Sequence, residues 1–168
     1  MVGKQVLLKD LIYKMITESS NFATDLVIDR VGAVNVMKTM REMGANDIRI
    51  LRGVEDDKAF ERGMNNTTTA YDLMLLFRQI ANGTAVDKAS CEAMIRILLD
   101  QHFKEVIDGK LPDGVKVASK SGWITGSCHD SGIVFLPDGR KYVLVLLSRN
   151  VRDHESAAEL ESTVSKLI

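Results

Sequence analysis

Cysteine and histidine are scarce in this sequence, and those present lie far apart. The two cysteines, Cys91 and Cys128, and the three histidines show no spacing typical of a metal site. We therefore expect no metal and no other cofactor. We also expect the cysteines to be isolated structural thiols rather than partners in a disulfide.

Long apolar runs and an excess of one charge are also absent. No run approaches the roughly 20 apolar residues that span a bilayer, and the first ten residues lack the apolar core of a secretory signal. A net charge of −1 provides no basic field for nucleic acid or an anionic membrane. With 168 residues of ordinary globular composition, the chain is expected to form a single domain over residues 1–168.

Apolar residues recur at helical spacing through the first two thirds of the chain, so residues 1–110 are expected to be mainly helical. The stretch 52–66 is rich in charge and poor in periodicity, and it is expected to be a loop with little regular structure. The predicted helices are 7–17, 23–31, 33–43, 70–81 and 88–99.

After Gly109 the pattern changes to runs rich in valine, isoleucine and leucine, which are typical of strands. Strands are predicted over 115–121, 131–136 and 141–148, the last two joined by a turn, and a helix over 155–167. Residues 111–168 would thus supply the sheet and the last helix of an α+β fold. Three strands leave an exposed edge, so we expect a partner chain or self-association to cover it.

The strongest local motif is Lys120-Ser121-Gly122, at the end of the first predicted strand and followed by Trp123. A lysine beside a hydroxyl suits the binding of a carboxylate, and the glycine lets a ligand approach the strand backbone. Ordinary strand ends also produce this motif.

A second motif, Ser19-Ser20-Asn21, lies between two predicted helices. Serine and asparagine there are usually caps and turn formers. The functional interpretation places the Ser19 hydroxyl and the Asn21 amide in a cleft, where one relays a proton and the other holds a substrate carbonyl.

Taken together, these motifs resemble a known family of serine hydrolases. Residues 15–32 resemble the S-D-N region of class A β-lactamases, with Ser20 in place of the central aspartate. Residues 120–123 and 129–134 resemble the family's K-T-G strand and its neighbour, and 65–70 resembles the start of the helix after its Ω-loop. The resemblance covers nearly the whole chain, in order.

The resemblance implies a role for each matching residue. Ser19 would pass a proton to the leaving nitrogen, and Asn21 would bind the acyl side-chain amide. Lys120 and Ser121 would bind the substrate carboxylate and tune Ser19 electrostatically. The backbone N–H of Trp123 would form one arm of the oxyanion hole.

The family's nucleophile, in S-x-x-K, has no counterpart here. No serine in the chain is followed by lysine three residues later, and only 18 residues precede Ser19. We therefore expect the β-lactamase/transpeptidase-like fold without its N-terminal helix and strands, and a chain that is inactive alone. The chain could be truncated, could be one half of a two-chain assembly, or could begin at an internal methionine of a longer protein.

The family's deacylating glutamate is only partly matched. Glu55 is the candidate base that activates water, but the asparagine of the family's E-x-x-L-N is missing. Glu55 could equally be a solvated loop acid. The parent could then be a DD-peptidase or penicillin-binding relative rather than an efficient β-lactamase.

The resemblance implies a β-lactam or peptide-like substrate and a periplasmic or secreted location. The remaining alternative is a non-catalytic binding module.

Overall fold

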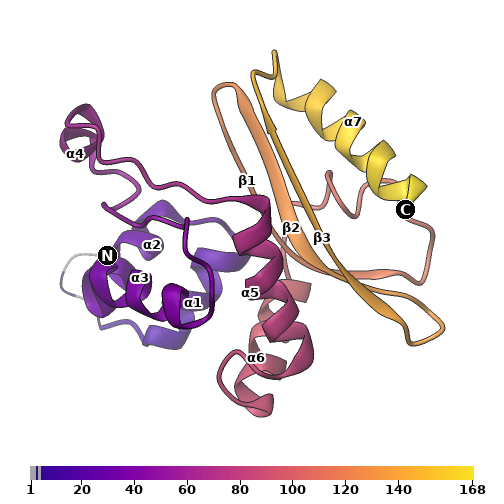
Figure 1. Cartoon of the computed structure of the whole chain (residues 1–168), viewed down its shortest axis with the longest axis horizontal. Coiled ribbons are helices and arrows are strands. Elements are labelled where there is room, and N and C mark those ends of the chain that lie inside the picture. Colours follow the sequence, from indigo (N-terminus) through magenta and orange to yellow (C-terminus); the bar gives the residue numbers. More distant parts are fainter. Residues whose placement is uncertain (1–2, 4) are drawn as a thin grey trace.

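The computed structural model describes residue 3 and residues 5–168, and it has the expected α+β architecture (Figure 1). Residues 1, 2 and 4, which belong to the predicted domain 1–168 and to the start compared with a secretory signal, lie outside the described residues. The elements are α1 Leu8–Thr17, α2 Asn21–Val31, α3 Ala33–Glu42, α4 Asp57–Glu61, α5 Ala70–Asn82, α6 Lys88–Leu99, β1 Lys116–Ile124, β2 Ser127–Phe135, β3 Lys141–Arg149 and α7 His154–Leu167.

Most helices begin at a side chain that accepts a hydrogen bond from a free backbone N–H of the first turn. Thr69 caps α5 and Asp87 caps α6, within a residue or two of the predicted bounds. The prediction that 52–66 has little regular structure was wrong for α4. Asp56 accepts a hydrogen bond from Ala59 N–H and starts this five-residue helix, which is too short to show a period.

The strands are longer than the sequence indicated. β1 and β2 pair in antiparallel register up to Ile124 and Ser127, and only Thr125-Gly126 separates them. Gly126 has φ +80°, a left-handed value that glycine adopts readily in this two-residue turn. Lys120-Ser121-Gly122 therefore lies inside β1, not at its end, and the predicted strand end was wrong because the turn keeps the ladder intact.

The sheet has the order β1-β2-β3 and is covered by helices on both faces (Figure 1). On one face, Ala118 and Ile133 pack against Phe77 of α5 and Leu98 of α6. On the other face, Cys128 packs against the α7 alanines, and the segment 101–115 contributes further apolar contacts. This arrangement places the C-terminal half of β1 between the helical block and α7.

Among the described residues, β3 pairs only with β2, so its outer edge is free. Cys91 and Cys128 are free and buried, as expected of structural thiols. No helix in the described part of the chain is both long and apolar enough to cross a membrane.

Candidate functional site

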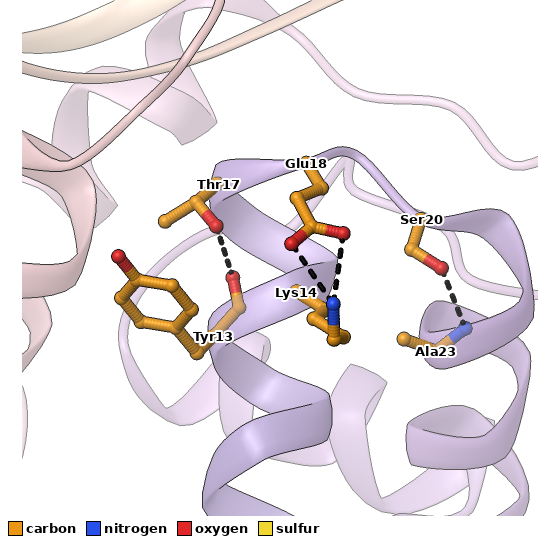
Figure 2. Close-up of polar contacts among 6 residues, drawn as sticks. All are labelled: Tyr13, Lys14, Thr17, Glu18, Ser20 and Ala23. Atoms are coloured by element: carbon orange, nitrogen blue, oxygen red, sulfur yellow. Dashed lines mark hydrogen bonds and ion pairs between the residues drawn. The ribbon is translucent and has the colours of Figure 1, made fainter.

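The corner between α1 and α2 presents Ser19 in an unusual backbone conformation. Ser19 has φ +51°, a left-handed value that costs a non-glycine residue on the order of 1 kcal/mol. The corner is fixed on both sides (Figure 2): Lys14 Nζ lies 2.9 Å from Glu18 Oε1, and Ser20 Oγ accepts a hydrogen bond from Ala23 N–H at 3.3 Å. The strain therefore falls on the residue for which the sequence predicts a catalytic role.

Lys120 reaches Ser19 across 101 residues of sequence. Its Nζ donates to Ser19 Oγ at 3.1 Å and also to the carbonyl of Ser121. Burial lowers the pKa of the Lys120 ammonium, while the nearby Asp130 acts in the opposite direction. In the described part of the chain, no carboxylate lies within ion-pair distance of Lys120. The ammonium charge is therefore available to a ligand.

A hollow of about 220 Å³ opens beside this hydrogen bond. We call it the Ser19 hollow. Four residues predicted from the sequence line it or contribute to its wall: Ser19, Ser121, Gly122 and Trp123. A Cβ built on Gly122 would meet no atom within 4 Å, so the strand backbone is open to a ligand there. The hollow offers hydroxyls, open backbone and a nearby cation in one place.

Asn21 and Glu55 meet each other, but neither lines the hollow. Asn21 Nδ2 donates to Glu55 Oε1 at 3.4 Å. Asp25 accepts hydrogen bonds from the N–H groups of Val54 and Glu55, and a Cβ on Gly53 would lie 3.0 Å from its carboxylate. The loop is thus held against α2, and Glu55 lies near the site without entering the hollow.

Gln101 is a positioning residue that the sequence analysis missed. It is 2% exposed, and its Nε2 donates to Ile16 O at 3.0 Å and to Ser119 O at 3.5 Å. One side chain therefore ties the end of α1 to β1, one residue before Lys120. A glutamine just after a helix carries no motif, so nothing in the sequence distinguishes it.

Asp130 is a second missed residue, although it lies within the stretch that resembles the family. It is 1% exposed and accepts hydrogen bonds from the N–H groups of Ile107 (3.1 Å) and Ser131 (2.9 Å). Burial raises its pKa to about 6, partly offset by these hydrogen bonds and by Lys120. The carboxylate joins the segment before β1 to the middle of the sheet.

Comparison with known proteins places this geometry in a family. A family model described as "Beta-lactamase enzyme family" matches residues 1–168. The crystal structure of a β-lactamase from Sphaerobacter thermophilus DSM 20745 is 27% identical, with a TM-score of 0.87, over 97% of this chain and 62% of that one. A variant of PBP-A, solved as its acyl-enzyme complex with penicillin G, is 27% identical, with a TM-score of 0.88, over 98% of this chain and 61% of that one.

A β-lactamase from Chitinophaga pinensis DSM 2588, at 22% identity and a TM-score of 0.89, shows the same fold over 98% of this chain and 64% of that one. The chain spans about three fifths of the length of these structures. The resemblance to class A β-lactamases and the predicted fold class are confirmed.

Replacing Gln101 with leucine should lower the free energy of unfolding by about 3 kcal/mol, because the buried Ile16 and Ser119 carbonyls lose their donor. Amide hydrogen exchange at His102, whose N–H donates to Thr17 O, should also accelerate. Urea unfolding and exchange NMR measure both effects, with the exposed Gln5→Leu as control. Equal stability of the two variants would contradict the bridging role.

Asp130 should make the stability depend on pH. Its folded pKa of about 6 lies above the ordinary value of 3.8, so ionisation penalises the folded state as pH rises from about 4 to 6. The stability advantage of the wild type over Asp130→Asn should therefore shrink across this window, by on the order of 3 kcal/mol. Urea unfolding at several pH values tests this, and a constant difference between the two proteins would refute it.

Proposed function

Because this chain belongs to the beta-lactamase enzyme family, we propose that the Ser19 hollow binds a β-lactam or a related amide and takes part in its hydrolysis through an acyl-enzyme. The 3.1 Å hydrogen bond from Lys120 Nζ to Ser19 Oγ carries this proposal: Ser19 lines the hollow, and Lys120, which is not among the lining residues, contacts it through Ser19. This bond brings the Lys120 ammonium and the Ser19 hydroxyl together near the open strand backbone at Gly122. A cation, a hydroxyl and free backbone groups can together bind an acyl substrate that ends in a carboxylate.

The proposed chemistry divides among the residues around the hollow. Lys120 and the Ser121 hydroxyl bind the substrate carboxylate, and Lys120 also polarises Ser19. Ser19 passes a proton to the leaving nitrogen, since its oxygen accepts from the ammonium and its own proton can be donated. The Trp123 N–H stabilises the oxyanion, and Asn21 binds the acyl side-chain amide.

The nucleophile comes, in this proposal, from residues that are not among these 168. No serine in the sequence has a lysine three residues later, and covalent catalysis needs such an activated hydroxyl. The isolated chain is therefore a binding unit that contains the acid/base and anchoring groups. Export to the periplasm or the exterior belongs to the same proposal and is supported by the family resemblance.

A penicillin-binding or DD-peptidase relative is the second candidate, and the surroundings of Glu55 favour it. Glu55 accepts from Asn21 and lies outside the residues that line the hollow. A base held away from the acyl group would activate water poorly, and the acyl-enzyme would persist. The two candidates therefore differ in the lifetime of the acyl-enzyme, not in the way the substrate is bound.

The free edge of β3 supports a third element of the proposal, a partner strand. Six of the nine β3 residues are apolar, and the side chains from Tyr142 to Ser148 are only half-buried. A further strand, from a partner chain or from a second copy, would satisfy the free backbone groups and cover this surface. In such an assembly a non-catalytic chain would still contribute the binding residues.

The pure chain should bind benzylpenicillin without turning over nitrocefin. Replacing Lys120 with methionine should weaken the binding at least about tenfold, because it removes a charge-assisted hydrogen bond to the carboxylate. Calorimetry measures the affinity, and Lys38→Met on the exposed face of α3 is the matched control. Equal affinities of Lys120→Met and Lys38→Met for benzylpenicillin, or steady nitrocefin hydrolysis by the wild type, would contradict the proposed function.

Sedimentation velocity tests the partner strand. The chain alone should show a mass above that of the 18.6 kDa monomer as its concentration rises, since β3 can pair with a second copy when no other strand is present. A single monomeric species up to high micromolar concentration would contradict self-association along this edge.

A further inference from the structure

The Ser19 hollow is lined by two aromatic side chains in addition to its polar groups. Phe103 and Trp123 both line it, with 41% and 64% of their surfaces exposed. Aromatic rings are usually buried because each can remove 150–250 Å² from water. Two exposed rings on one hollow are typical of a surface that a ligand covers.

The Trp123 indole is held in place although it is exposed. Its ring lies 5.1 Å from the His154 imidazole, centroid to centroid, and His154 Nε2 lies 3.9 Å from Glu105 Oε1. The N–H of Val151 donates to Gly126 O, so α7 begins beside the β1–β2 turn (Figure 1). The indole thus packs against one side chain of α7, and that side chain and the start of α7 are themselves tied to Glu105 and to the β1–β2 turn.

Gln101, which joins α1 to β1, also contacts the backbone of Phe103. The Phe103 backbone N–H donates to Gln101 Oε1 at 3.2 Å, while Gln101 Nε2 joins α1 to β1. The backbone that carries Phe103 is therefore tied to the same side chain that joins α1 to β1. A ligand that engages Ser19 and Lys120 would carry its substituent to a fixed position relative to the two rings.

The carboxylates of the hollow favour an apolar substituent over a cationic one. Glu18 is paired with Lys14 at 2.9 Å, and Glu105 faces His154. A ligand cation would have to compete with these partners. The Trp123 ring already packs against the His154 imidazole, but most of its surface and much of that of Phe103 are exposed and would gain contact area against a flat ring.

We infer that Phe103 and Trp123 form a specificity subsite that packs an aromatic or similar apolar ring of the substrate. This inference rests on the proposed function, and it adds the class of substrate. Trp123 then acts twice: its N–H faces the developing oxyanion, and its indole selects the substituent.

The single tryptophan of the chain provides a direct reporter. Benzylpenicillin, which carries a phenyl ring, should change the Trp123 fluorescence saturably. It should bind about tenfold more tightly than 6-acetamidopenicillanic acid, which has the same bicyclic nucleus, carboxylate and side-chain amide without the ring. Calorimetry gives both affinities independently of the fluorescence.

Variants distinguish a specific effect of the indole ring on ligand affinity from a general effect on the fold. Trp123→Ala keeps the backbone N–H and should abolish the preference for benzylpenicillin over 6-acetamidopenicillanic acid, whereas Trp123→Phe should keep most of that preference. Tyr71→Ala on α5, an aromatic residue of similar exposure (65%) outside the hollow, is the matched control and should change neither affinity.

The outcomes distinguish this inference from the proposed function. Equal affinities for the two penicillins, or a preference that survives Trp123→Ala, would overturn the subsite and leave the proposed function standing. Failure of both penicillins to bind would overturn the proposed function and the subsite with it.

Discussion

The buried amide of Gln101 connects the two halves of the candidate site. Ser19 lies just after α1 and Lys120 lies in β1, and besides the direct Lys120–Ser19 hydrogen bond, the Gln101 side chain joins α1 to β1 through Ile16 and Ser119. Its Oε1 also accepts from Phe103 N–H. A glutamine has two donors and an acceptor in one plane, so it can satisfy three backbone groups that burial would otherwise leave unpaired.

The buried charge of Asp130, in the middle of the sheet, is likewise stabilised by hydrogen bonds to the backbone. Asp130 pairs with two backbone N–H groups and lies near Lys120, so each group offsets part of the other's cost of burial. Lys120 is held close to Ser19 without a carboxylate bound directly to it. An ammonium that is half-buried and outside a direct ion pair attracts an anionic ligand more strongly than one already in an ion pair.

Strand β1 contributes both a cation, Lys120, and an aromatic ring, Trp123, to the surroundings of the hollow. Side chains alternate along β1, so Lys120 and Trp123 lie on opposite faces of the sheet. Because β1 is an edge strand beside the hollow, both can border the same ligand, one through its ammonium and the other through its ring. The exposure of Trp123 and the left-handed backbone of Ser19 are both costs to the fold, and both occur at this site.

Local sequence patterns predicted the fold class, most helix bounds and the two motifs, because caps and hydrophobic periodicity depend on residues close together in the chain. They missed α4, which is too short to show a period, and they ended β1 early because the Thr125-Gly126 turn was not recognised. The family resemblance brought Ser19 and Lys120 together as an expectation.

The contacts that support the Ser19–Lys120 pair depend on the tertiary structure. Gln101 contacts Ile16 across 85 residues of sequence and Ser119 across 18, Asp130 contacts Ile107 across 23, and neither position carries a local pattern. The same holds for the convergence of Phe103, Trp123 and His154, which depends on how the segment before β1, the hairpin turn and α7 pack. Buried hydrogen bonds between distant segments depend on three-dimensional packing, and a sequence pattern reports only neighbours along the chain.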